Sequence, residues 1–165
     1  MSGAVRIMGL DPGTARLGYG MLESQKNRVV ALGFGVLETP PGPLGTRLES
    51  LFVELEALLE RGRPDVAVVE QLFFGQNTRS ALAVGHARGI ILLALARAEV
   101  PVLEVTPAEV KQAVTGYGAA DKGQVQAMVT RLLALPAPPR PDDAADALAI
   151  AWCGLGPARM RERLS

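Results

Sequence analysis

Four carboxylates lie at positions where a negative charge is costly. Asp11 ends the apolar run VRIMGL and Glu70 ends the run VAVV, so both should emerge at the carboxyl ends of buried strands. Asp143 and Asp146 are three residues apart, a spacing that places two helical side chains on one face, about 5–6 Å apart at Cβ. Carboxylates that converge repel one another unless a cation lies between them, and hard oxygen ligands suit Mg²⁺ or Mn²⁺. The pattern therefore predicts a divalent-metal site.

Each of these acids also has an ordinary structural explanation. An aspartate before Pro12-Gly13 is typical of a turn, and Asp142 or Asp143 at a helix start is typical of an N-cap. Asp146 is harder to explain in this way. It lies inside the otherwise apolar stretch 144–152, where an unpaired buried charge costs several kcal/mol. We expect Asp142 to cap the helix and Asp146 to be functional.

The hydrophobic pattern predicts a sheet that carries Asp11 and Glu70 in its middle. Alternation and turn residues predict strands at 4–11, 17–23, 28–38, 65–70 and 101–105. Helical spacing predicts helices at 43–62, from 77 or 78 to 98, from 106, around 125–133 and at 142–153. Three hairpin-linked strands followed by right-handed crossovers give an α/β fold, a mixed five-stranded sheet with helices on both faces. We predict one domain over 1–155 and a basic, mobile tail over 156–165.

The composition excludes several classes of protein. The chain has 165 residues, of which 48% are apolar, enough for a core without a disulfide or structural metal. Its single cysteine, Cys153, favours a reducing, cytoplasmic setting. The most apolar run, 89–96, is far shorter than the roughly 20 residues of a membrane span, so we expect no membrane partner. Because 17 basic residues balance 17 acidic ones, the chain is no simple polycation, although a local basic face remains open.

Several ordered motifs carry a family resemblance. The chain resembles the RuvC family of bacterial Holliday junction resolvases from about residue 5 to 152, in the family's order and nearly its spacing. The matching segments are GLDPGTARLGYG (9–20), VVEQLFFGQNTRSAL (68–82), GHARG (85–89), VKQAVTGYGAADKGQVQ (110–126) and PDDAADALAIA (141–151). The resemblance implies a ribonuclease H-like fold, a homodimer and Mg²⁺-dependent cleavage of four-way junction DNA. It further suggests the branch-migration proteins RuvA and RuvB as partners.

The resemblance also implies which residues form the catalytic metal site. The family's four catalytic acids match Asp11, Glu70, Asp143 and Asp146. The doublet 142–143 leaves open which aspartate is the ligand, and the Asp-Ala-Ala-Asp spacing favours Asp143. In a site with two Mg²⁺ ions, for which Mn²⁺ can substitute, one ion activates the attacking water and the other stabilises the leaving 3′ oxygen. Asp11 is the best candidate to bridge both ions, and no general base is then required.

Four further residues are candidates for DNA binding. Lys111 and Lys122 match lysines that the family uses in DNA binding or catalysis, whereas without the resemblance they read as solvated helix-end lysines. Arg79 is a candidate for a phosphate contact. The resemblance gives Phe73 the role of stacking on an unpaired base, and burial in the core is the alternative. A row of small residues at 81, 85 and 89 fits either packing on the sheet or a dimer contact.

We therefore predict a structure-selective endonuclease. It would make paired symmetric nicks in Holliday junctions during homologous recombination and DNA repair, and leave 5′-phosphate and 3′-hydroxyl ends. One alternative is a ribonuclease H-like nuclease for RNA or another branched nucleic acid. A second is an actin-like ATPase, because GLDPGT resembles a phosphate-loop turn, although that fold needs more than twice this length. A third, a catalytically silent junction-binding module, is disfavoured by the intact set of acids.

Overall fold

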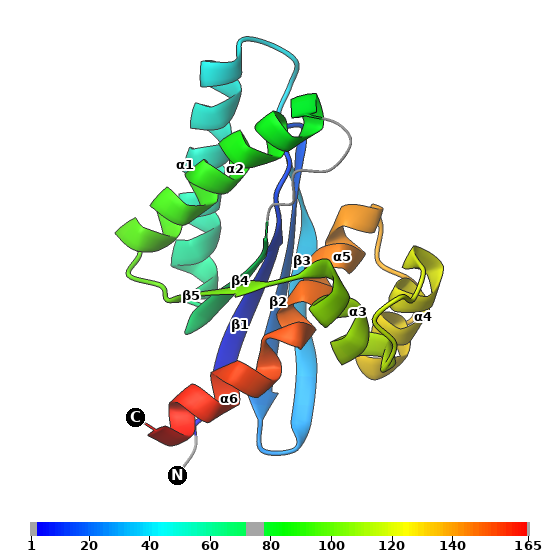
Figure 1. The fold of residues 1–165 in the computed structure, drawn as a ribbon. Helices are drawn as coiled ribbons and strands as arrows, with labels where there is room; N and C mark the ends of the chain where they lie inside the picture. The colour runs from blue at the N-terminus through cyan, green and yellow to red at the C-terminus, as the bar shows by residue number, and fades with distance from the viewer. Residues whose placement is uncertain (1–2, 72–77, 165) are drawn as a thin grey trace.

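The computed structural model describes residues 3–71 and 78–164 (Figure 1). Its strands are β1 (Val5–Asp11), β2 (Arg16–Gln25), β3 (Arg28–Glu38), β4 (Val66–Glu70) and β5 (Val102–Val105). Its helices are α1 (Leu44–Gly62), α2 (Thr78–Arg97), α3 (Pro107–Thr115), α4 (Lys122–Leu132), α5 (Asp142–Cys153) and α6 (Leu155–Leu164). The predicted succession of strands and helices is confirmed, with bounds that differ by only a few residues.

The five strands form one mixed sheet in the order β3-β2-β1-β4-β5 (Figure 1). The central strand β1 pairs antiparallel with β2 and parallel with β4. Because β1 and β4 run in the same direction, their carboxyl ends, Asp11 and Glu70, lie at the same end of the sheet. The prediction that both acids emerge in the middle of a sheet is confirmed.

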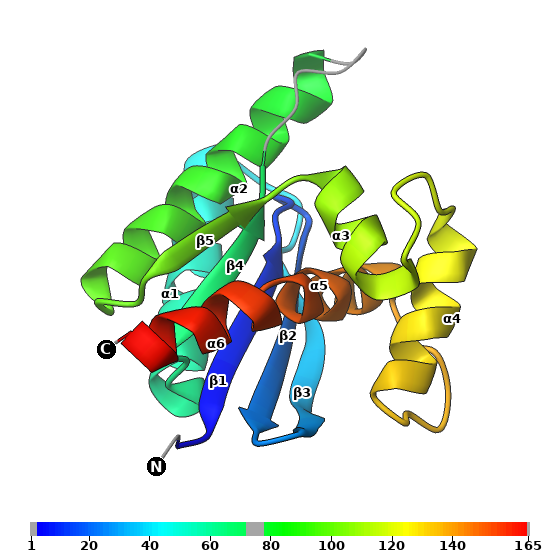
Figure 2. The ribbon, with the colours of Figure 1, turned by 60° about the horizontal axis from the view of Figure 1, so that its bottom comes forward.

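Helices cover both faces of this sheet, as predicted. Alternate residues of β1 and β4 point to opposite faces, so Ile7 and Val68 pack with α3, α4, α5 and α6, while Met8 and Val69 pack with α1 and α2. Figure 2 shows α5 and α6 in front of the sheet and α1 and α2 behind it. By this alternation Gly9 and Asp11 point to the face that α5 covers.

Glycines on the central strands let α5 approach the sheet closely. A Cβ atom on Gly9 would lie 2.0 Å from the main-chain oxygen of Ala147, and one on Gly18 would lie 2.2 Å from that of Asp143. Gly18 is also the direct partner of Asp11 in the β1–β2 pairing. The backbone of α5 therefore rests on the sheet beside Asp11, at the level where the helix carries its own aspartates.

The start of α5 differs from the prediction. Asp142 was expected to be the N-cap, but that position is Pro141, and no side chain caps the helix. Asp142 is instead the first helical residue, and its carboxylate accepts a hydrogen bond of 2.8 Å from Nη1 of Arg140. The capping prediction is wrong because a neighbouring guanidinium, rather than the main-chain N–H groups, engages this carboxylate. By contrast, the helix predicted from 106 begins as expected, because Thr106 caps α3 through a capping box with Glu109.

The final segment, which we expected to be a mobile tail over 156–165, continues the fold as α6. Ala158 is buried in the same core cluster as Ile7 and Val68, and Nε of Arg159 donates a hydrogen bond of 2.9 Å to Oγ of Ser24 on β2. The division into a domain of 1–155 and a separate tail stays a prediction.

None of the helices within 3–71 and 78–164 has the length and hydropathy needed to cross a membrane. The longest helix, α2, spans 20 residues but contains Arg79, Arg88 and Arg97. Its apolar run at 89–96 is thus bracketed by charges, as the sequence indicates.

Candidate active site

Three aspartates converge at the carboxyl end of β1. Asp11 ends this strand, and Asp143 and Asp146 lie in the first turns of α5. One carboxylate oxygen of each residue lies within 4.8 Å of the other two, and all three side chains are half-buried. The predicted convergence of these acids is confirmed, and Asp143 rather than Asp142 completes the cluster. We call Asp11, Asp143 and Asp146 the aspartate cluster.

Glu70 lies beside the aspartate cluster, at the end of the neighbouring strand β4. It lines the same cleft as Asp11 and Asp146, although it is not one of the three residues within 4.8 Å of one another. Its charge reaches the cluster, because repulsion from Glu70 contributes to a raised pKa of Asp11. All four predicted acids therefore meet at one end of the sheet, three of them in contact range of one ion.

The cleft in front of these acids has a volume of about 240 Å³. Lys111 of α3 and Lys122 of α4 face it together with the acids, as expected of a site that handles a phosphate backbone. The lining residues are Asp11, Glu70, Pro107, Val110, Lys111, Lys122, Val125, Asp146, Ala149 and Ile150. The structure thus brings both predicted lysines to the predicted acids, from segments that are distant in the sequence.

Lys122 is held at the rim of the cleft by the start of α4. Asp121 caps this helix through a capping box with Gln124, which fixes the first turn and Lys122 within it. Nζ of Lys122 lies 3.3 Å from Oδ2 of Asp146 and 3.8 Å from Oδ2 of Asp142. Partial burial lowers the pKa of Lys122, but attraction to these carboxylates outweighs burial and raises it above its ordinary value. With 58% of its side chain exposed, this cation can also meet a ligand.

The electrostatics of the cluster favour a bound cation. Burial, followed by repulsion from Asp146, Asp143 and Glu70, raises the pKa of Asp11 from its ordinary 3.8 to about 7. Burial likewise raises the pKa of Glu70 and that of Asp146, and Lys122 opposes the rise at Asp146. Carboxylate oxygens at this separation are the donors that Mg²⁺ and Mn²⁺ prefer. The donor set therefore fits a divalent metal, which would offset the mutual repulsion.

Comparison with known proteins shows the family to which the chain belongs. The family model described as crossover junction endodeoxyribonuclease RuvC matches residues 7–154. The chain belongs to the RuvC family. Among similar relatives, RuvC of Desulforamulus reducens is 55% identical over 148 residues, which are 89% of this chain and 91% of the relative. RuvC of Chloroflexus aurantiacus is 55% identical over 150 residues, 90% of this chain and 92% of the relative.

Solved structures agree with this membership of the RuvC family. T. thermophilus RuvC in complex with a Holliday junction substrate is 37% identical, with a TM-score of 0.88 over 96% of this chain and 97% of that one. The yeast mitochondrial Holliday junction resolvase Ydc2 shares the fold at 17% identity, with a TM-score of 0.67 over 97% and 84% of the two chains. The predicted ribonuclease H-like fold class is confirmed.

One cation near the RuvC-family site was missed by the sequence analysis. Arg16, the first residue of β2, places Nη1 4.0 Å from Oδ2 of Asp143 and Nε 3.3 Å from Oε1 of Glu38. It pairs with a member of the aspartate cluster other than the partner of Lys122, and 53% of its side chain is exposed. The signal that could have found it is the β1–β2 hairpin, since strand pairing brings the start of β2 to the end of β1.

Other predicted residues of this RuvC-family chain are not placed at the site. Phe73 lies outside the described residues. Arg79 belongs to α2, but its side chain is outside the described part of the chain. The base-stacking role of the first and the phosphate contact of the second stay predictions. His86, the chain's one histidine, is exposed on α2 and is absent from the described lining of the cleft.

Proposed function

We propose that the protein resolves four-way DNA junctions as a metal-dependent endonuclease, through the cleft formed by the aspartate cluster, Glu70, Lys111 and Lys122. The observation that carries this proposal is the convergence of three carboxylates within 4.8 Å in a chain of the RuvC family. Membership of this family disfavours the actin-like ATPase. The acids that the chain keeps in a cleft disfavour the catalytically silent binding module.

The residues that would hold the metal are Asp11, Asp143 and Asp146, with Glu70 at the edge of the site. Bound Mg²⁺ or Mn²⁺, in one or two positions, would lower the pKa of an attacking water and stabilise the leaving 3′ oxygen. Asp11 is the candidate to be shared by two ions, because it belongs to the cluster with Asp143 and Asp146 and lines the same cleft as Glu70.

The basic residues would hold the DNA strand against this site. Lys111 and Lys122 line the cleft from α3 and α4, and Arg16 flanks the cluster from β2. When DNA binds, Lys122 would exchange its pairing with Asp146 for a contact with a backbone phosphate. No histidine is among the described residues that line the cleft, and activation of the water by a metal would require no side-chain general base.

We further propose that two copies pair through α2, which would give a junction two cleavage sites. Leu82 and Leu93 of α2 are 58% and 51% exposed, and a Cβ on Gly89 would meet open space, so this face can accept a close neighbour. The small-residue row is thus divided, since Ala81 is buried in the protein's own core. Leu93→Glu should produce monomers in sedimentation velocity. Val53→Glu, on an exposed site of α1, should leave the dimer intact.

The proposed activity is tested by a panel of labelled substrates. A synthetic four-way junction, a linear duplex and an RNA/DNA hybrid of the same sequence are each incubated with and without Mg²⁺. We expect Mg²⁺-dependent paired nicks in the junction alone, with ends that a ligase can seal. Preferred cleavage of the RNA/DNA hybrid would instead support the ribonuclease H-like alternative. RuvA and RuvB as partners stay predictions, and adding them to this assay would show whether they alter cleavage.

A further inference from the structure

Arg88 of α2 joins the helix to the strand end that carries Glu70. Its Nη1 donates a hydrogen bond of 2.8 Å to the main-chain oxygen of Glu70, and its Nη2 pairs with Oε1 of Glu104 on β5. Only 14% of the Arg88 side chain is exposed. A guanidinium offers its donors in a rigid planar fork, so two such bonds fix the distance between the ends of two neighbouring strands.

Arg88 acts from the face of the sheet opposite to the cleft. It belongs to α2, which covers the face of Met8 and Val69, whereas Glu70 follows the alternation of Val68 toward α5. The sheet therefore separates the guanidinium from the Glu70 carboxylate. Arg88 is bonded to the main chain of Glu70 and neutralised by Glu104, so it is arranged to hold the residue in place rather than to change the charge of the site.

A second hydrogen bond, from the neighbouring strand β5, fixes the same strand end. The main-chain N–H of Gln71 donates to the oxygen of Val105 on β5, at 2.7 Å. The chain on either side of the Glu70 side chain is thus anchored, by Arg88 at the Glu70 carbonyl and by β5 at the next amide. The carboxylate projects into the cleft from a backbone that has little freedom to rotate.

We propose that Arg88 is a positioning residue for the metal site, which holds the main chain of Glu70 so that its carboxylate faces the aspartate cluster. This inference rests on the proposed function of that cluster as a metal site. Partners that orient a ligand typically contribute 10- to 100-fold to metal affinity. Arg88 would make a contribution of this kind through the backbone, without touching metal or DNA.

The test is a titration of the metal-free protein with Mn²⁺, in which electron paramagnetic resonance measures the free ion. Arg88→Met should raise the Kd for Mn²⁺ about 10-fold. Arg88→Lys keeps a cationic donor group but not the planar fork, so it should recover part of the affinity, and it also guards against a methionine variant that fails to fold. Arg97→Met is the matched control, because Arg97 lies on the same helix and pairs with Glu56, above the ring of Phe52 and remote from the cleft.

A double mutant separates positioning of Glu70 from a general loosening of the fold. In a Glu70→Gln background, Arg88→Met should cause no further loss of Mn²⁺ affinity, because its effect passes through the Glu70 carboxylate. An undiminished tenfold loss in that background, or wild-type affinity in Arg88→Met itself, would overturn the inference. If the wild-type protein bound Mn²⁺ but left junctions uncut, the proposed function would fail while the role of Arg88 in metal binding could still be read.

Discussion

The two faces of the sheet are packed in different ways. On one face α5 lies against glycines of β1 and β2, and the side chains it buries there are largely alanines. On the other face α1 contributes Leu51, Leu55, Leu58 and Leu59, which pack against Met8 and Leu10 of the same central strand. Figure 2 shows the helices of both layers on either side of the strands.

This difference reflects what each face carries. Main-chain atoms of α5 lie directly against glycines of the sheet, so no change of side-chain rotamer can compensate for a displacement of the helix. The distance of α5 from β1 is therefore tightly fixed. That distance determines how far Asp143 and Asp146 lie from Asp11. The leucine-rich face can adjust its side-chain rotamers without moving any of these acids. Changes on the α5 face should therefore reduce cleavage, whereas changes on the α1 face should mainly reduce stability.

The largest effect is expected for Asp146→Asn on the α5 face. The substitution keeps the bulk of the side chain but removes a ligand charge, so cleavage of a four-way junction should fall about 1,000-fold, or about 4 kcal/mol in the barrier. Junction binding in a gel-shift assay should be retained, and the melting temperature of the metal-free protein should not fall. Normal cleavage by the folded variant would remove Asp146 from the metal site.

Leu55→Ala makes the corresponding change on the α1 face. Leu55 is fully buried, so its truncation should lower the free energy of unfolding by about 3 kcal/mol, which urea denaturation would measure. The rate of junction cleavage per folded molecule at 25 °C should stay within about twofold of wild type, because no acid moves. A large loss of cleavage in this variant would contradict the conclusion that the α1 face contributes mainly to stability.

Gly9→Ala tests the close contact directly. The added Cβ would meet the Ala147 oxygen at 2.0 Å and force α5 away from the sheet, at a cost of about 2 kcal/mol in stability. Misplacement of the aspartates should also slow cleavage about 10-fold. Gly33→Ala on the edge strand β3 is the control, since a Cβ there meets nothing within 4 Å and should leave activity unchanged. Equal behaviour of the two variants would show that close packing does not set the site geometry.

The pH dependence of the free energy of unfolding should also arise on the α5 face, to which Asp11 points. Because the pKa of Asp11 is raised from 3.8 to about 7, the native state binds this proton more tightly than the unfolded state. Without metal, the free energy of unfolding should therefore fall as pH rises from about 4 to about 7. Mg²⁺ should then raise the melting temperature by about 3 °C more at pH 8 than at pH 5. An Asp11→Asn variant should lose most of this difference, and an equal Mg²⁺ effect at both pH values would argue against charge repulsion in the cluster.

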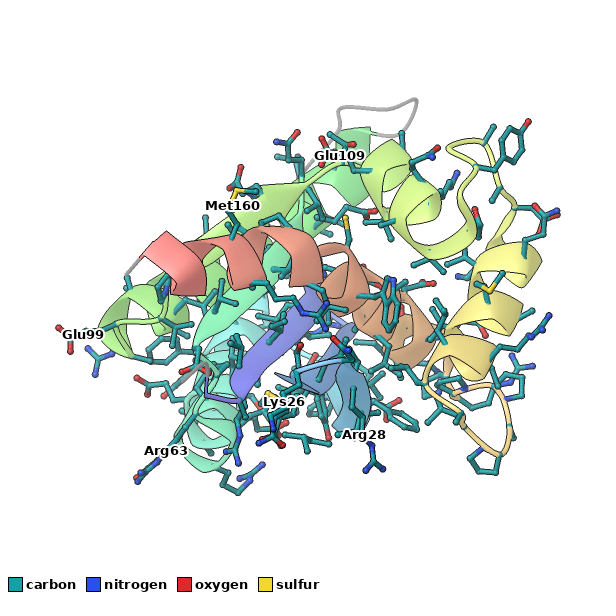
Figure 3. The ribbon with its side chains drawn as sticks, turned by 90° about the horizontal axis from the view of Figure 1, so that it is seen from below. Lys26, Arg28, Arg63, Glu99, Glu109 and Met160 are labelled. Carbon is teal, nitrogen blue, oxygen red and sulfur yellow. The ribbon has the colours of Figure 1, made fainter. Side chains whose placement is uncertain are left out.

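The smallest effect concerns Lys122, at the rim of the cleft. If its ammonium meets one phosphate, Lys122→Ala should weaken junction binding and reduce the slope of log affinity against log salt by about one unit. Lys26→Ala is a suitable control, because Lys26 is exposed at the end of the sheet where β1 begins, where Figure 3 also labels Arg28 and Arg63. An unchanged slope would mean that Lys122 acts on the aspartates rather than on DNA.

The sequence was sufficient to predict the elements and most of the site because those signals are local. Alternation and turn residues identified β1, and an uninterrupted apolar run identified β4, so the acids that end both strands could be placed. The three-residue spacing of Asp143 and Asp146 needed only helical geometry. The family resemblance supplied the lysines, which local pattern alone would have left as solvated residues.

What could not be predicted depends on contacts between distant segments. The roles of Gly9 and Gly18 follow from the register of β1 with β2 and from the path of α5 across them. Asp142 has the residue type of a cap, and only the folded chain shows Arg140 and Lys122 beside it. In the sequence Arg88 only precedes the apolar run 89–96, and nothing in α2 indicates that a strand end lies within its reach.

The placement of the acids along the chain has a consequence for synthesis. A growing polypeptide completes β1 early, yet Asp143 and Asp146 leave the ribosome only after most of the protein has been made. Until α5 docks on the glycines of β1 and β2, a nascent chain holds Asp11 and Glu70 without their partners. Cleaving activity should therefore arise only with this late, long-range step of folding. A chain arrested before α5 is made would lack Asp143 and Asp146, and we expect it not to cut DNA.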